Sequence, residues 1–239
     1  MKKLYEKNEI LFAVAWIVIY CVISGTLRGS FGDESPWMLL GLAAITAGIA
    51  VFISRNRLQS RYGLDSWPHD WKKFWYFIPM WILTTGNLWG GVSLAYSGIY
   101  QVCAVLSMAL IGYIEEVIFR GFLFKALLKK DGETFAVIVS AVTFGIGHIV
   151  NLFSGQTSLE TVMQVPFAIA WGFIFTMVFF KSGSLLPGIL AHSLVDVFSK
   201  FSVDDPAASW CYVIATIIIA VIYCLYLRKL DTPDENKVN

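Results

Sequence analysis

Long runs of apolar residues, separated by short polar segments, recur along the whole chain. Most runs approach the roughly 20 residues that an α-helix needs to cross a hydrocarbon core about 30 Å thick. Eight runs can be delimited, at residues 10–27, 36–53, 74–94, 99–127, 134–153, 161–180, 184–201 and 209–227. The pattern predicts an all-α, polytopic bundle of about eight transmembrane helices. The seventh run is the weakest, and a re-entrant or tilted segment lining a cavity is the alternative there.

Composition agrees with this prediction, and the distribution of charge predicts how the bundle is oriented in the membrane. Of the 239 residues, 57% are hydrophobic and 15% charged, and the mean hydropathy is +0.66. If the first segment is cytoplasmic, all of the 18 Lys and Arg residues fall in inner segments except Arg28, Arg120 and Lys200. The positive-inside rule then places both termini in the cytoplasm, as in a multi-pass protein of the cell membrane. The net charge of +1 gives no reason to expect a nucleic-acid partner.

Three formal charges lie within one apolar run, at Glu115, Glu116 and Arg120. A charged side chain near the middle of a bilayer costs about 2.5–3.5 kcal/mol, so such residues are usually retained for function. On a helix, Glu116 and Arg120 are four positions apart and share a face, whereas Glu115 points about 100° away from Glu116. We therefore predict that Arg120 neutralises and holds Glu116, which leaves Glu115 free to face another group.

Two later runs add histidines and one more acid. His148 ends the sequence Phe-Gly-Ile-Gly-His, and His192 precedes Asp196 by four positions, on the same helix face. With a rise of about 1.5 Å per residue, Glu116, His148 and His192 lie roughly 17, 21 and 12 Å from the cytoplasmic ends of their helices. All three depths fall in the central part of a bilayer, so these side chains can meet. The basic loops suggest access to them from the cytoplasm.

This combination of acids, histidines and one arginine is typical of a hydrolytic site. A desolvated carboxylate can take a proton from water, a neutral histidine can orient that water, and polar donors can stabilise an oxyanion. The same groups also suit a Zn²⁺ ion, although no HExxH sequence is present. Two other classes stay open. The groups can form the relay of a proton-coupled transporter, or they can be idle in a non-catalytic membrane adaptor.

The four cysteines, Cys21, Cys103, Cys211 and Cys224, stand singly in apolar runs without paired spacing. We interpret them as free thiols with no disulfide or metal role.

Three spaced motifs resemble those of a known family. They are Glu115-Glu116-x-x-x-Arg120, Phe144-x-x-x-His148 and His192-x-x-x-Asp196, in this order. This series is similar to that of the CAAX prenyl-endopeptidase and bacteriocin-processing family of intramembrane proteases, also called the Abi family. The resemblance covers residues 99–201. It implies an endopeptidase that acts on a peptide or protein at the membrane, in peptide processing or in self-immunity against a bacteriocin.

The resemblance also implies roles for the individual residues. Glu115 would be the general base on water, with His148 as its partner, and Glu116 with Arg120 would be a supporting pair. His192 and Asp196 would stabilise the tetrahedral oxyanion. The family often has Asn where this chain has Asp196, so Asp196 is either a protonated donor or a metal ligand. If a metal is present, its ligands would be Glu115, His148, His192 and Asp196.

The resemblance suggests a division into three parts. Residues 1–98 would form N-terminal transmembrane helices and a cytoplasmic loop, residues 99–201 the catalytic helices, and residues 202–239 the last helix and a polar tail. Near the motifs, we expect Gly145 and Gly147 to serve close packing, although glycine there could also admit a substrate backbone. We expect Asn151 to cap a helix end, with a position flanking the site as the alternative, and Lys200 to be an ordinary outer-loop charge.

Overall fold

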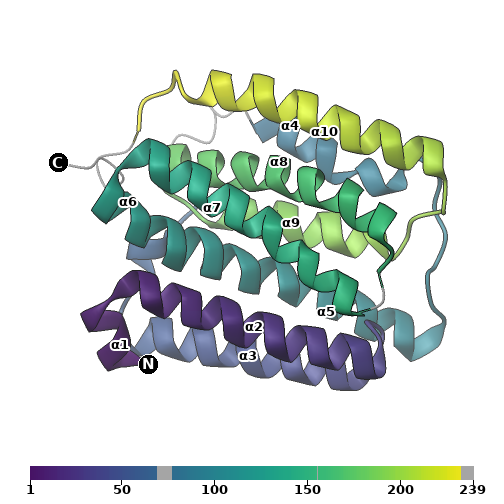
Figure 1. Ribbon diagram of the computed structural model, residues 1–239, viewed down its shortest axis with the longest axis horizontal. Coiled ribbons are helices and arrows are strands. Elements are labelled where there is room, and N and C mark those ends of the chain that lie inside the picture. Colours follow the sequence, from purple (N-terminus) through teal and green to yellow (C-terminus); the bar gives the residue numbers. More distant parts are fainter. Residues whose placement is uncertain (69–76, 155, 233–239) are drawn as a thin grey trace.

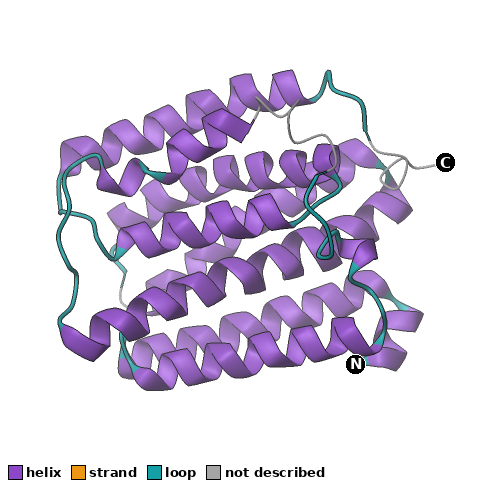
Figure 2. Ribbon diagram, turned by 180° about the vertical axis from the view of Figure 1, so that it is seen from behind, coloured by secondary structure: helices purple, strands orange, loops and turns teal. Residues whose placement is uncertain are grey.

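The described part of the chain is a bundle of helices that run back and forth along one axis (Figures 1 and 2). A computed structural model describes residues 1–68, 77–154 and 156–232. Within these ranges there is no strand, and the only β-type pairing is an isolated bridge between Val92 and Ser202. The predicted all-α class is confirmed.

The helices have the following bounds: α1 Lys2–Lys7, α2 Glu9–Phe31, α3 Pro36–Arg55, η1 Ser60–Tyr62, α4 Phe77–Thr84, η3 Gly86–Leu88, α5 Gly98–Glu116, η4 Val117–Phe124, α6 Lys125–Asp131, α7 Glu133–Gly147, η5 His148–Ser154, α8 Ser158–Ser182, α9 Leu186–Ser199 and α10 Pro206–Leu227. The segment η4 is a π-helix, and η1, η3 and η5 are 3₁₀-helices. Helices α5, η4 and α6 join into one continuous helix of 34 residues, Gly98–Asp131.

Six helices of the described chain are long and apolar enough to cross a membrane. They are Glu9–Phe31, Pro36–Arg55, Gly98–Asp131, Glu133–Leu152, Ser158–Ser182 and Pro206–Leu227. The predicted eight full spans are therefore reduced to six among the described residues. Helix α9, in the predicted seventh span, has only 14 residues and is about 21 Å long, short of the hydrocarbon core. In the predicted third span α4 has 8 residues, and residues 74–76 lie outside the described residues.

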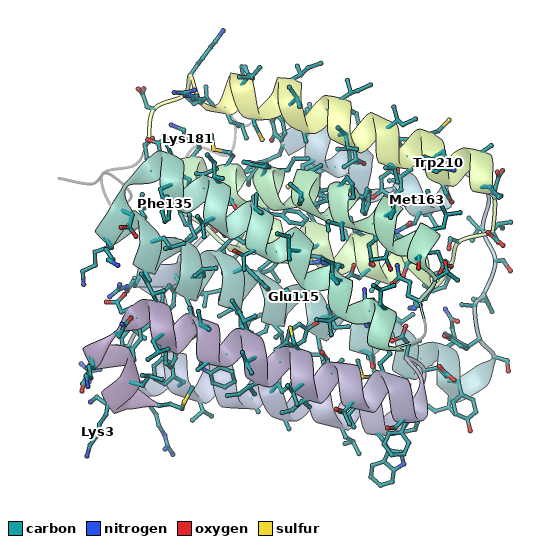
Figure 3. All side chains as sticks on the ribbon, viewed as in Figure 1. Lys3, Glu115, Phe135, Met163, Lys181 and Trp210 are labelled. Atoms are coloured by element: carbon teal, nitrogen blue, oxygen red, sulfur yellow. The ribbon has the colours of Figure 1, made fainter. Side chains whose placement is uncertain are left out.

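The basic segments gather at one end of the bundle. Figure 1 shows α1, α6 and the end of α10 at this end, and Figure 3 shows Lys3 and Lys181 there, opposite Met163 and Trp210. The turn between α2 and α3 lies at the other end (Figure 1). The inner segments, which carry most of the Lys and Arg residues, thus lie together at one end, as the alternation of inner and outer segments predicts. The assignment of the basic end to the cytoplasm stays a prediction.

Aromatic packing at the basic end fixes α2 against the rest of the bundle. The Phe12 ring lies 4.7 Å from the Phe52 ring of α3 and 5.0 Å from the Phe122 ring of η4, measured between centroids. All three side chains are buried. Tyr20, eight residues after Phe12 in α2, lies about 12 Å further along the bundle, at the level of Glu115, which it contacts.

Helices α5 and α9 approach very closely at Gly112. A Cβ atom built at this glycine would lie 2.5 Å from the backbone nitrogen of Ser193 and 2.7 Å from its Cα. No side chain fits there without moving a helix, because the obstacle is backbone. Since Ser193 follows His192, this contact sets the distance between the α5 acids and the α9 histidine.

The Gly112→Ala substitution is expected to lower the free energy of unfolding by about 1–3 kcal/mol, because it overpacks the α5/α9 contact. Thermal unfolding of the purified protein in detergent measures the effect. Gly29→Ala is the matched control, since a Cβ atom there would have no neighbour within 4 Å. An unfolding midpoint for Gly112→Ala equal to that of Gly29→Ala would show that the two helices can separate at no cost.

Candidate active site

The acidic pair lies where the long helix changes from α to π geometry. Helix α5 ends at Glu116, and the π-helical segment η4 begins at Val117 and contains Arg120. π-Helical turns inside α-helices are frequent at functional sites, because they re-aim side chains. Figure 3 places Glu115 about midway along the bundle.

Arg120 and Glu116 form a fully buried ion pair. Both side chains are 0% exposed, and Nη1 of Arg120 lies 2.9 Å from Oε1 of Glu116. The guanidinium also donates to the carbonyl oxygen of Gly172 at 3.3 Å and to the Thr176 hydroxyl at 3.4 Å, and it lies 4.2 Å from the ring centroid of Phe144. The predicted i, i+4 pair is confirmed, and the hydrogen bonds and cation–π contact compensate part of its desolvation.

His192 connects this ion pair to the other carboxylates. Its Nδ1 lies 2.8 Å from Oε1 of Glu116, and because a carboxylate only accepts, we assign a hydrogen to Nδ1. Its Nε2 lies 3.5 Å from Oε2 of Glu115 and 3.6 Å from Oδ2 of Asp196. The imidazole ring stacks on Phe175, with centroids 5.1 Å apart. His192 is thus fixed at one nitrogen and turned toward two acids at the other.

Glu115 is held from a helix that the sequence analysis did not link to it. The hydroxyl of Tyr20 in α2 donates to Oε1 of Glu115 at 2.6 Å. The sequence shows Tyr20 only as a single aromatic in an apolar run, and no spacing rule relates it to an acid 95 positions later. Oε2 of Glu115 is the oxygen that faces His192.

The six predicted site residues fall into two groups, those that line a cavity of about 390 Å³ and those that do not. Glu115, His148, His192 and Asp196 line it, whereas Glu116 and Arg120 lie behind them. His148 follows the last residue of α7, and its Nδ1 lies 3.1 Å from the carbonyl oxygen of Phe144, which only accepts, so Nδ1 carries the hydrogen. The structure therefore brings together all three motifs, as the depth estimate predicted.

Of three neighbours of the motifs, Gly145 agrees with the expectation, whereas Gly147 and Asn151 differ from it. Gly145 does serve packing, since a Cβ atom there would lie 2.7 Å from the backbone nitrogen of Ile169. Gly147, in contrast, lines the cavity and would have nothing within 4 Å of a Cβ atom. Asn151 does not cap a helix. It also lines the cavity, accepting from Nη1 of Arg28 at 3.2 Å and donating to Gln164 at 2.9 Å.

Lys200 is not the ordinary outer-loop charge that we expected. Its side chain is 15% exposed, and Nζ lies 2.9 Å from Oδ2 of Asp33, whose Oδ1 accepts from Nε of Arg28 at 2.6 Å. Burial alone would raise the pKa of Asp33, but the two cations outweigh this and hold it below its usual value. Arg28, Asp33 and Lys200 all line the cavity.

These residues determine which end of the bundle the cavity reaches. The partly exposed side chains of Arg28, Asp33 and Lys200 belong to the end opposite the basic segments. If the basic end is cytoplasmic, the cavity opens on the outer side. Access from the cytoplasm and the positive-inside assignment therefore exclude each other, because they require the cavity to open at opposite ends, and both stay predictions.

The four candidate ligands do not fit a metal ion as they are placed. Among the described residues, no group of three or more His, Cys, Asp and Glu side chains is arranged to hold one. Nδ1 of His192 contacts Glu116 and Nδ1 of His148 contacts the Phe144 carbonyl. Metal-binding histidines also make such contacts, so only the spacing of the four side chains speaks against a metal. The Zn²⁺ interpretation of Glu115, His148, His192 and Asp196 therefore finds no support in this arrangement.

The Tyr20→Phe substitution is expected to lower kcat for peptide cleavage about tenfold while leaving KM and the unfolding midpoint nearly unchanged. The reason is that it removes one hydrogen bond to a carboxylate without removing the ring. Steady-state kinetics measures the two constants separately. Tyr100→Phe is the control, since Tyr100 is 52% exposed. An equal loss in both variants would exclude a specific role for the Tyr20 hydroxyl.

The fold and the cavity together define a class of protein. It is a multi-pass membrane protein whose interior holds two acids and two histidines around a cavity, an arrangement suited to hydrolysis. Residues 99–198 match the model of the Rce1-like family, described as type II CAAX prenyl endopeptidase Rce1-like. The match confirms the resemblance seen in the motifs and includes all six predicted site residues. No curated protein and no solved structure matches the chain. The matched family is one of CAAX-type proteases, and the match supports this class for residues 99–198.

Proposed function

We propose that this protein is an intramembrane endopeptidase that hydrolyses a peptide bond with a water molecule activated by Glu115. The observation that carries the proposal is the contrast between the two adjacent acids. Glu116 is enclosed by Arg120 and His192 away from the cavity. Glu115 lines the cavity, with one oxygen fixed by Tyr20 and the other directed toward His192. One acid is thus tied into the structure and the other is exposed to a substrate.

The proposed reaction uses Glu115 as base and then as acid. Glu115 takes a proton from water while the oxygen of that water attacks the carbonyl carbon of the peptide bond. Nε2 of His148, whose Nδ1 hydrogen is directed to the Phe144 carbonyl, accepts a hydrogen bond from the second O–H of the water and so orients it. Glu115 then returns the proton to the departing amine as the C–N bond breaks. The products are a new carboxylate and a new amino terminus.

The oxyanion formed during the attack requires donors, and His192 with Asp196 are proposed to supply them. A protonated His192 offsets part of the negative charge of Glu115 and directs an N–H from Nε2 into the cavity. Asp196 donates in its protonated form, as buried carboxylic acids can. Removal of one oxyanion donor typically costs about 10²–10³ in kcat. Glu116 and Arg120 act indirectly, because Glu116 orients the ring of His192.

The experiment is detection of new peptide termini by mass spectrometry after the detergent-purified protein has met a diverse peptide mixture. New termini are expected with the wild-type protein and with Glu6→Gln, in which an exposed glutamate is changed, but not with Glu115→Gln. Cleavage is expected to persist with a chelator. Cleavage by Glu115→Gln at the wild-type rate would overturn the proposal, and loss of cleavage with the chelator would replace bare glutamate by a metal-dependent mechanism.

The substrate is proposed to be a peptide or protein segment at the membrane. Processing of secreted peptides and self-immunity against a bacteriocin are the roles that suit a protease of the cell membrane whose cavity is open to its outer side. Neither role requires a nucleic acid or a soluble cofactor.

A further inference from the structure

Three carboxamide side chains line the cavity on the side formed by η5 and α8. They are Asn151 in η5, Gln156 shortly after η5, and Gln164 in α8. Gln164 is the unusual one, because residues 162–167 are otherwise all apolar and it lies about 9 Å from the start of the span Ser158–Ser182. A polar amide at such a position needs hydrogen-bond partners. The contacts of its oxygen and of its nitrogen therefore have to be considered separately.

A chain of hydrogen bonds fixes the orientation of the Gln164 carboxamide. The Arg28 guanidinium only donates, and its Nη1 lies 3.2 Å from Oδ1 of Asn151. The nitrogen of the Asn151 amide is therefore the end that faces Gln164, and it donates to Oε1 of Gln164 at 2.9 Å. Nε2 of Gln156 donates to the same oxygen at 3.0 Å. Gln164 is thus held by its oxygen, which leaves both hydrogens of its Nε2 for another acceptor.

No such acceptor is found in the described part of the chain. Nε2 of Gln164 makes no hydrogen bond there, and it is not one of the buried polar atoms that lack a partner. Because the side chain lines the cavity, a molecule in the cavity can reach this nitrogen. Two donors on one oxygen thus present the amide hydrogens of Gln164 to a ligand in a fixed orientation.

The proposed substrate offers an acceptor of the right kind. A peptide that enters a cavity at membrane depth loses the water around its N–H and C=O groups, so these groups need new partners. A neutral amide donor fits a main-chain carbonyl oxygen. Asn151, which holds Gln164, follows His148 by three residues of 3₁₀-helix, which corresponds to about 6 Å. Since an extended peptide advances about 3.3 Å per residue, the carbonyl would lie about one to three residues from the bond placed at Glu115.

We propose that Gln164 is a substrate-binding residue, whose Nε2 donates a hydrogen bond to a main-chain carbonyl oxygen of the peptide near the cleaved bond. Asn151 and Gln156 are positioning residues, because they act through the oxygen of Gln164. This inference rests on the proposed peptidase function and gives the cavity a contact with the peptide backbone that does not depend on side chains. The competing explanation is structural, in which the three amides only tie η5 to α8.

The test replaces one carbonyl oxygen at a time by sulfur in an octapeptide that the wild-type protein cleaves, and leaves the cleaved bond itself unchanged. Sulfur accepts hydrogen bonds more weakly than oxygen, whereas the N–H groups and the charge of the peptide stay the same. At one position, about one to three residues from the cut, the thioamide is expected to lower kcat/KM about tenfold. Equal cleavage of the parent peptide and of every thioamide peptide would overturn the inference while leaving the peptidase function intact.

Gln164→Met separates substrate binding from a structural role, because it removes the amide and keeps a side chain of similar length. This variant is expected to cleave the parent peptide about tenfold less efficiently than the wild type and to cleave the sensitive thioamide peptide equally well as the parent. Gln59→Met is the matched control, since Gln59 lies between α3 and η1 and does not line the cavity, and it should keep the tenfold difference. If the amides only tie η5 to α8, Gln164→Met lowers the cleavage of both peptides equally, the tenfold difference persists, and the inference fails.

The positioning residues are tested with the same pair of peptides. Asn151→Leu and Gln156→Met each remove one of the two donors to Oε1 of Gln164. Because the other donor still holds the oxygen, each variant is expected to reduce the tenfold difference to about threefold. A difference that stays tenfold in both variants would overturn the positioning role.

A binding measurement tests the inference even if no peptide is cleaved. The Glu115→Gln protein serves as a trap, and a peptide that it retains from a diverse octapeptide mixture is prepared with a single thioamide at each position in turn. Titration by fluorescence anisotropy is expected to show about tenfold weaker binding for one position, and no difference in Glu115→Gln combined with Gln164→Met. Equal affinity at every position, or retention of no peptide, would overturn the inference. Thioamide-sensitive binding without any cleavage would contradict only the peptidase function.

Discussion

The Glu115→Gln protein is expected to cleave peptides about 10³-fold more slowly than the wild type, in line with the usual contribution of a general base of about 10²–10⁴. Glutamine has nearly the same shape, and its carbonyl oxygen can still accept the hydrogen bond from Tyr20 that now reaches Oε1 of Glu115 at 2.6 Å. It cannot take a proton from water. Because Glu115 borders the cavity, its neutralisation leaves no buried charge unpaired. Single-turnover cleavage rates measure the loss of activity, and unfolding midpoints of the same preparations measure any loss of stability.

Glu116→Gln provides the matched comparison, because it changes the adjacent residue in the same way. Glu116 is 0% exposed and accepts from both Arg120 and His192, so this variant is expected to lose stability as well as activity. Loss of activity without loss of stability should therefore be specific to Glu115. If Glu116→Gln were inactive and fully stable while Glu115→Gln cleaved peptides normally, the assignment of the two acids would have to be exchanged.

The parts of this site that depend on one helix could be predicted from the sequence. The pairing of Glu116 with Arg120 and the shared face of His192 and Asp196 follow from the four-residue period of a helix, and both are found. The meeting of the three motifs followed from their similar depth in the bilayer. Depth is a useful guide only because a membrane restricts each helix to nearly the same axis.

The parts that depend on contacts between distant helices could not be predicted in this way. Tyr20 meets Glu115 because Phe12 packs α2 against Phe52 and Phe122, and nothing in one sequence shows which apolar helices are neighbours. The π-helical turn after Glu116 likewise has no sequence signal, since it depends on how the long helix is packed.

Charges near helix ends were misinterpreted for a related reason. Lys200 follows the last residue of α9, where a lysine is usually solvated, and only the tertiary fold brings it to Asp33. The length of α9 was overestimated because the apolar run 184–201 includes residues that precede the helix start at Leu186. Apolar composition indicates burial in protein or lipid, but it does not show where the helix ends.

Replacement of Arg120 by leucine is expected to lower the free energy of unfolding by about 3–5 kcal/mol, the usual cost of breaking a buried ion pair from one side. This loss of stability arises chiefly from Glu116, the partner of Arg120 in the ion pair. Glu116 would keep its negative charge at 0% exposure and would retain only His192 as a donor to its Oε1. Its Oε2 already has no hydrogen-bond partner among the described residues. Thermal unfolding in detergent, with Arg55→Leu at an exposed position of α3 as control, measures the difference.

The double variant Arg120→Leu with Glu116→Gln distinguishes the loss of attraction from the exposure of an unpaired charge. Removing both charges eliminates the desolvated carboxylate, so the double variant is expected to be more stable than Arg120→Leu alone. Because the two residues are in contact, their effects should not add. If the double variant were instead less stable by the sum of the single losses, the pair would contribute through packing of the guanidinium against Phe144 and Thr176. The charged pair would then be needed to orient His192 for catalysis and not to stabilise the bundle.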